Sequence, residues 1–248
     1  MATTDIYCTD QAAKQQLVQI GKRIYDGQYV LNTDGNISIR VSPFEIWVTP
    51  TSVSKGYMTE DMMVKMNLDG EVIAGTHKPS SEVKMHLRLY QENPAIGAVV
   101  HAHPFAATSF AVAGIPLDLP LMAESSMQLG VVPVVHYATP GTNDVADGVA
   151  PYCQNYGGVL LSNHGTLTWG HNIMQAFYRL EVMENYAKTT LAVLQLGQAR
   201  LLSQPQVEAL AGLKKTWKID DGVLPQGAAK ETNTTDVLKS NLQIANNN

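Results

Sequence analysis

The stretch Ala95-Ile96-Gly97-Ala98-Val99-Val100-His101-Ala102-His103 is the most informative part of this chain. Its first six residues are apolar and partly β-branched, which predicts a short buried strand. Because side chains alternate across a strand, His101 and His103 fall on the same face. A third histidine, His164, lies in the distant turn Asn163-His164-Gly165. Three neutral imidazoles would leave one coordination position of a metal ion open, as a catalytic Zn²⁺ site needs. Alternatively, His101 and His103 are ordinary histidines at the end of a strand.

Length and composition limit the class of protein. The chain has 248 residues, of which 45% are hydrophobic and 16% are charged, so it can bury one sizeable core. Its formal net charge of −5 disfavours nucleic acid and anionic membranes as partners. No apolar run approaches the roughly 18 residues of a membrane span, and the first residues do not resemble a signal peptide. Two cysteines without metal-motif spacing suggest reduced thiols, so we expect a cytoplasmic globular protein.

Helix and strand patterns are mixed along the chain. Helical spacing predicts helices over residues 10–29, 78–90, 105–112 and 173–196. Alternating or short apolar segments predict strands over residues 37–41, 45–49, 63–68, 71–74 and 158–162. The dipeptide Asp69-Gly70 is a hairpin signal, so the pairing should be antiparallel. We expect a single sandwich-like domain over residues 1–226 and a polar, disordered tail over residues 227–248, in which 237–244 could form a short helix.

Small polar residues form a second set of candidates. Ser80, Ser81 and Glu82 stand at the start of a predicted helix. Serines suit capping, and a glutamate is favoured there by the helix dipole alone. Alternatively, hydroxyls and free N–H groups at a helix start can bind an anion such as phosphate. The turns Thr33-Asp34-Gly35-Asn36 and Pro50-Thr51-Ser52 would add two further loops rich in N–H groups.

Five motifs follow one another in a defined order within residues 12–196. They are Gly35-Asn36-Ile37-Ser38, Thr49-Pro50-Thr51, Lys78-Pro79-Ser80-Ser81-Glu82, Val100-His101-Ala102-His103 and Asn163-His164-Gly165. This ordered set resembles the class II aldolase family, which includes L-fuculose-phosphate aldolase, L-ribulose-5-phosphate 4-epimerase and the adducin head domain. The resemblance implies an α/β fold, a three-layer α/β/α sandwich with a largely antiparallel central sheet. It also implies a homotetramer with active sites between subunits.

The resemblance further implies a role for individual residues. His101, His103 and His164 match the ligands of Zn²⁺, although Mn²⁺ or Co²⁺ would suit the same donors. Glu82 matches a carboxylate that touches the metal at rest and transfers a proton. The phosphate-binding positions are matched by Gly35, Asn36, Thr51, Ser52, Ser80 and Ser81. The implied reaction is cleavage of a ketose 1-phosphate, by way of an enediolate, into dihydroxyacetone phosphate and an aldehyde.

Three departures from the family pattern keep alternatives open. Ser52 stands where the phosphate loop usually has glycine. The tyrosine that donates a proton in the fuculose-phosphate enzyme aligns near Met122, and Glu124 is the nearest acid that could replace it. Glu82, rather than an aspartate, resembles the aldolases more than the epimerase. A decarboxylase or a sugar-phosphate 4-epimerase on the same scaffold remains an alternative. So does a non-catalytic module like the adducin head, which has no chemical reason to keep the histidines and the glutamate.

Overall fold

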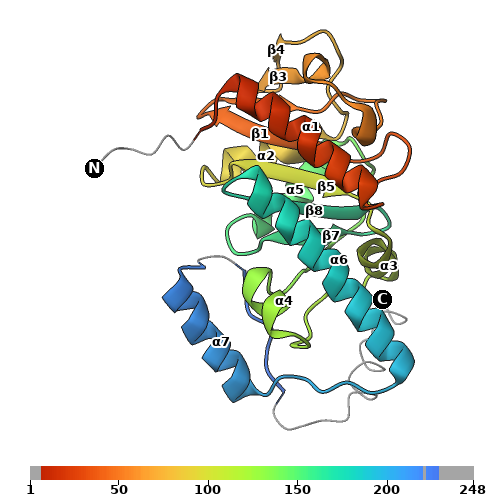
Figure 1. Ribbon diagram of the computed structural model, residues 1–248, viewed down its shortest axis with the longest axis vertical. Helices are drawn as coiled ribbons and strands as arrows, with labels where there is room; N and C mark the ends of the chain where they lie inside the picture. Colours follow the sequence, from red (N-terminus) through yellow and green to blue (C-terminus); the bar gives the residue numbers. More distant parts are fainter. Residues whose placement is uncertain (1–6, 220–221, 229–248) are drawn as a thin grey trace.

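An eight-stranded sheet forms the centre of the molecule (Figure 1). The computed structural model describes residues 7–219 and 222–228. The strands lie in the order β4-β3-β2-β1-β5-β8-β7-β6. Their bounds are β1 (Asn36–Ser42), β2 (Glu45–Val48), β3 (Val64–Asn67), β4 (Val72–Ala74), β5 (Ala98–Ala102), β6 (Val134–Val135), β7 (Gly158–Leu161) and β8 (Gly165–Gly170). All neighbouring pairs are antiparallel except β6 with β7, which confirms the largely antiparallel sheet.

Helices cover both faces of this sheet, and the expected α/β/α sandwich is confirmed. The α-helices are α1 (Asp10–Asp26), α2 (Val83–Glu92), α3 (Phe105–Ala113), α4 (Ala123–Gln128), α5 (Asn143–Val149), α6 (Ile173–Leu196) and α7 (Gln204–Trp217). Three short 3-10 helices are η1 (Lys55–Tyr57), η2 (Glu60–Met62) and η3 (Ala150–Tyr152). α1 and α6 cover one face, where Leu17 and Phe177 share a core with Val100. α2 and α5 cover the other face, where Leu89 shares a second core with Val99. Neighbouring residues of β5 therefore contribute to opposite cores, as the alternation of a strand requires.

Strand pairing brings three of the sequence motifs to one end of the sheet. β1 begins at Asn36, which is paired with His101 near the end of β5. β8 begins at Gly165, and the next residue, Thr166, is paired with Ala102 at the end of β5. Because β5 runs antiparallel to both neighbours, its last residues lie beside the first residues of β1 and β8. The residues of a site can therefore converge there although they are far apart in sequence.

The helix predicted from residue 78 begins later, and that boundary is wrong. α2 starts at Val83. Pro79 forms an isolated antiparallel bridge with Pro50, so the chain is still extended at this point. A proline also disfavours the helical conformation in the residue before it. Glu82 consequently occupies the N-cap position without capping the helix through its side chain, and residues 80–81 precede the helix instead of opening it.

The two predictions for the C-terminal part of the chain are a long helix and a polar tail. The long helix over residues 173–196 is confirmed as α6, which ends at Gly197 in the left-handed conformation. Most of the predicted tail, with its possible helix at 237–244, lies outside the described residues, so the division at residue 226 stays a prediction. Within the described ranges, no helix is long and apolar enough to cross a membrane.

Candidate active site

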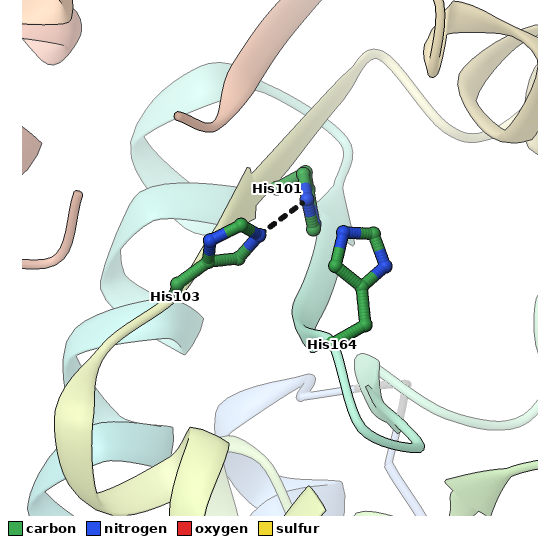
Figure 2. A group of neighbouring side chains, drawn as sticks. All are labelled: His101, His103 and His164. Carbon is green, nitrogen blue, oxygen red and sulfur yellow. Dashed lines mark hydrogen bonds between the residues drawn. The ribbon is translucent and has the colours of Figure 1, made fainter. Parts of the chain in front are cut away.

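The three histidines of the sequence motifs meet in space (Figure 2). His101 comes from β5, His103 follows the end of that strand, and His164 lies in the turn between β7 and β8. One ring nitrogen of each lies within 4.8 Å of those of the other two. The Nε2 atoms of His101 and His103 are 3.0 Å apart. This arrangement could hold a metal ion.

The turn that carries His164 depends on two special backbone positions. Asn163 has a φ of 54°, in the left-handed region that asparagine tolerates better than most residues. A Cβ atom on Gly165 would lie 2.4 Å from Cδ2 of His103 and 2.7 Å from the carbonyl oxygen of Ala102. Any side chain at position 165 would therefore displace the His103 ring. The glycine allows β8 to begin in contact with that imidazole.

Hydrogen bonding and burial prepare the imidazoles as ligands. His101 is fully buried, and its Nδ1 lies 2.8 Å from the carbonyl oxygen of Thr166. Since a carbonyl only accepts, Nδ1 must carry the proton, which leaves Nε2 available for a metal. Burial, and then the neighbouring imidazoles of His101 and His164, lower the pKa of His103 to about 3. His103 is therefore neutral near pH 7, as a metal ligand has to be, and the donors fit a divalent cation.

Glu82 completes this group. Its Oε1 lies 3.0 Å from Nε2 of His164, and its Oε2 lies 3.4 Å from Nε2 of His101. Burial opposes the charge of Glu82, but His101 and His164 outweigh burial and hold the pKa of Glu82 well below its ordinary value. The carboxylate is therefore ionised. We call Glu82, His101, His103 and His164 the His–Glu cluster; imidazole nitrogens with a carboxylate oxygen are donors that Zn²⁺ accepts.

The Thr33–Asn36 turn packs directly on this cluster. Gly35 has a φ of 74°, and a Cβ atom there would lie 2.8 Å from the carbonyl oxygen of His101. Asn36 is buried, and its side-chain amide donates to Oε2 of Glu82 at 2.9 Å. Oδ1 of Asn36 is also buried and has no hydrogen-bond partner in the described structure. The side chain of Asn36 thus contacts the carboxylate of Glu82 and helps to orient it.

The other candidates for phosphate binding lie on two adjacent segments. The N–H group of Thr51 donates to the carbonyl of Lys78 at 2.9 Å, so this N–H group already has a partner. Ser80 is buried, and its hydroxyl accepts from the N–H group two residues further on at 3.3 Å. Ser52 and Ser81 are exposed. The bridge described above joins these segments, which places the four residues in one region beside Glu82.

Glu124, the candidate proton donor, is not brought to the cluster within this chain. It lies in the first turn of α4 and is exposed. In the part of the chain that the structure describes, no hydrogen bond or ion pair joins Glu124 to the His–Glu cluster. Its role stays a prediction.

Sequence patterns missed one charged residue of this region. Lys55, the first residue of η1, is 1% exposed. Its Nζ donates to the carbonyl of Thr33 at 3.0 Å and to that of Val53 at 2.7 Å. A lone lysine in a short segment without periodicity gives no sign of burial, so only the folded structure shows that it joins these two loops.

Comparison with known proteins agrees with the geometry. Residues 15–191 match the family described as Class II Aldolase and Adducin N-terminal domain. The chain belongs to this class II aldolase family. The resemblance inferred from the five motifs is therefore confirmed.

Individual members of the family show how far the likeness extends. L-fuculose phosphate aldolase of Methanococcus maripaludis is 34% identical over 173 residues, which are 70% of this chain and 93% of that protein. The 3-oxo-tetronate 4-phosphate decarboxylase of Haemophilus influenzae is 30% identical over 207 residues, or 82% of this chain and 97% of that one. A solved structure of L-fuculose 1-phosphate aldolase, 31% identical, has a TM-score of 0.78 and covers 85% of this chain and 99% of its own. Family membership and these relatives support lyase activity.

Ser52 provides a test of how this chain departs from the class II aldolase pattern. Its φ is 57°, in the left-handed region where glycine is free of strain. Ser52→Gly should raise the free energy of unfolding by about 0.5–1 kcal/mol, because relief of Cβ strain exceeds the extra entropy of the unfolded chain. Ser54, with a φ of −63°, is the matched control. Ser54→Gly should lower the free energy of unfolding by about as much, as measured by urea denaturation. An equal decrease in the free energy of unfolding of Ser52→Gly and Ser54→Gly would contradict backbone strain at Ser52.

Proposed function

We propose that this chain is a metal-dependent class II aldolase that cleaves a ketose 1-phosphate, of the L-fuculose phosphate type, into dihydroxyacetone phosphate and an aldehyde. The observation that carries the proposal is the contact of an ionised, largely buried carboxylate, Glu82, with two imidazoles of a three-histidine group. Relatives named L-fuculose phosphate aldolase that share most of the chain support this choice of reaction.

We propose His101, His103 and His164 as the ligands of a Zn²⁺ ion, with Glu82 as a further ligand at rest. Mn²⁺ and Co²⁺ suit the same donors but bind such sites more weakly in general, which favours zinc. When bound, the cation would act as a Lewis acid that stabilises negative charge on the oxygens of the donor ketone. The hydrogen bond from His101 to Thr166 would hold the first ligand in its required tautomer and orientation.

In this proposal Glu82 transfers the proton to and from the carbon next to the carbonyl of the three-carbon fragment. Cleavage leaves an electron pair on the carbon next to the carbonyl of the three-carbon fragment, and that carbon must take up a proton. In the reverse direction the same carboxylate would remove the proton. Asn36 would keep Glu82 in place through its amide, and a largely buried carboxylate held in this way is well suited to such a transfer.

The substrate's phosphate would lie among Gly35, Asn36, Thr51, Ser52, Ser80 and Ser81. The joining of their segments beside Glu82 supports this assignment. We propose that Glu124, in place of the family's tyrosine, takes the hydroxyl proton from the part of the substrate that leaves as the aldehyde, and returns that proton as an acid in the reverse direction. Because Glu124 is exposed on α4, it would have to act on the site of a neighbouring subunit. The homotetramer and the cytoplasmic location both stay predictions from the sequence.

A decarboxylase is the second candidate, because one relative that covers 82% of this chain is named 3-oxo-tetronate 4-phosphate decarboxylase. Loss of CO₂ from a β-keto acid also leaves an electron pair on a carbon next to a carbonyl, and Glu82 could transfer a proton from water to that carbon. The 4-epimerase and a module without catalysis are less well supported by the relatives reported above.

An assay of product release distinguishes these reactions. The metal-loaded protein would be incubated with L-fuculose 1-phosphate and with 3-oxo-tetronate 4-phosphate, and dihydroxyacetone phosphate and CO₂ would be measured separately. We expect dihydroxyacetone phosphate from the ketose phosphate as the faster reaction. Faster release of CO₂ from the acid would favour the decarboxylase, and neither product with metal bound would favour a binding module.

A further inference from the structure

Lys55 is a buried cation that has no carboxylate partner among the residues that the structure describes. Its side chain ends among backbone carbonyls, where it donates to Thr33 and Val53. Among residues 7–219 and 222–228, no carboxylate oxygen lies within 4.0 Å of its Nζ. An ammonium group taken out of water without a nearby counter-charge is unfavourable in a folded protein. Lys55 therefore differs from an ordinary lysine with its ammonium group in water.

The surroundings of Lys55 show that its charge is only partly balanced. Burial lowers the pKa of Lys55 to about 8, while the negative charges of Asp34 and Glu82 act in the opposite direction from a greater distance. The backbone of Lys55 is also held in place, since a Cβ atom on Gly21 of α1 would lie 2.8 Å from its carbonyl oxygen. The ammonium group is buried and held by its two hydrogen bonds, so an additional anion would have to come to it.

The two carbonyls that Lys55 binds belong to the two loops on which the proposed function depends. Thr33 opens the turn that contains Gly35 and Asn36, and Val53 directly follows Thr51 and Ser52. One ammonium group thus ties together both loops from their buried side. The sequence indicates hydroxyls and N–H groups as the anion-binding groups of this region, and Lys55 adds a positive charge on the buried side of the loops.

We infer that Lys55 is the buried counter-charge of the substrate's phosphate group and a positioning residue for the two loops that bind it. The inference rests on the proposed function, because it takes those loops as the phosphate site. Lys55 itself does not touch the substrate. Its positive charge acts on the anion from beneath the loops, where the screening by water is weak.

Exchange of solvent deuterium into dihydroxyacetone phosphate, and into unphosphorylated dihydroxyacetone, tests this role. Lys55→Met removes the charge and keeps a side chain of similar length. We expect KM for dihydroxyacetone phosphate to rise about 10- to 30-fold with kcat changed much less, the factor expected of one unit charge at moderate distance. The rate constant kcat/KM for unphosphorylated dihydroxyacetone and the metal content should stay as in the wild type. Equal losses for both ketones would mean that Lys55 only supports the fold, and would overturn the inference.

Two further measurements keep the test decisive. Lys55→Met should still unfold cooperatively in urea and be folded under assay conditions, because removal of a buried charge offsets part of the loss of the hydrogen bonds to Thr33 and Val53. Lys55→Arg, which retains the charge, should keep the preference for the phosphorylated ketone, and loss of that preference in a folded Lys55→Arg protein would also overturn the inference.

Ser81→Ala separates failure of this inference from failure of the proposed function. If Ser81→Ala loses the preference for phosphate while Lys55→Met keeps it, the phosphate site stands and the role of Lys55 is wrong. If the wild type has no preference for the phosphorylated ketone, the proposed phosphate site fails and the role of Lys55 fails with it.

Discussion

Replacing His103 by alanine is expected to leave the purified protein without its divalent metal. His103 is neutral and partly buried, and its Nε2 faces that of His101 at 3.0 Å, so its loss would remove one of three nitrogen donors from the His–Glu cluster. The two remaining imidazoles and the carboxylate are placed around a site that also used His103, so the affinity for the metal should fall steeply when that donor is lost. Elemental analysis of wild-type and variant protein after dialysis against a weak chelator gives the measurement, and activity should disappear with the metal.

His171→Ala is the matched control for that experiment. His171 follows the far end of β8, is exposed, and its Nδ1 lies 3.0 Å from the carbonyl oxygen of Ala95. The control should keep both metal and activity. Full metal occupancy in His103→Ala would remove His103 from the proposed ligands.

Glu82→Gln is expected to separate metal binding from proton transfer. Glutamine preserves the shape of the side chain and can still contact Asn36 and His164, but it cannot accept a proton at neutral pH. The three histidines should retain most of the metal. Exchange of solvent deuterium into dihydroxyacetone phosphate should fall by about 10²–10⁴-fold, the usual contribution of a general base.

Glu92→Gln, at the other end of α2, controls for the loss of one negative charge. Glu92 is exposed and forms an ion pair with Arg88 at 2.8 Å. This control should exchange deuterium at the wild-type rate. If Glu82→Gln also exchanged at that rate, another group would have to move the proton.

The central part of the candidate site could be predicted because each of its members stands in a local pattern. His101 and His103 come at the end of an apolar segment, which the sheet confirms as strand β5, with His101 inside the strand and His103 just after it. His164 lies in a turn with Asn163 in the left-handed conformation, as a turn containing asparagine and glycine suggests. Sequence alone could not show that these two patterns meet, since that depends on the pairing of β5 with β8.

Features set by tertiary contacts could not be predicted in the same way. The start of α2 was placed too early because local preference for a helix does not reveal the bridge between Pro50 and Pro79. Lys55 was missed for the same reason: its burial results from packing of η1 under α1, not from its neighbours in sequence. The short strand β6, paired in parallel with β7, also lacks a periodic signal, because two residues are too few to show alternation.

The position of β8 between β5 and β7 has a consequence for the order of events during synthesis of the chain. His101 and Thr166, whose hydrogen bond fixes the first imidazole, are 65 positions apart. On the ribosome, β5 can pair with β1 as soon as it emerges, but its other edge stays open until β8 has been made. A nascent chain that already contains Glu82, His101 and His103 lacks both the third imidazole and the carbonyl that orients the first. If the His–Glu cluster holds the proposed metal, retention of the ion requires β8 to be in place, and a chain truncated before His164 should not retain the ion.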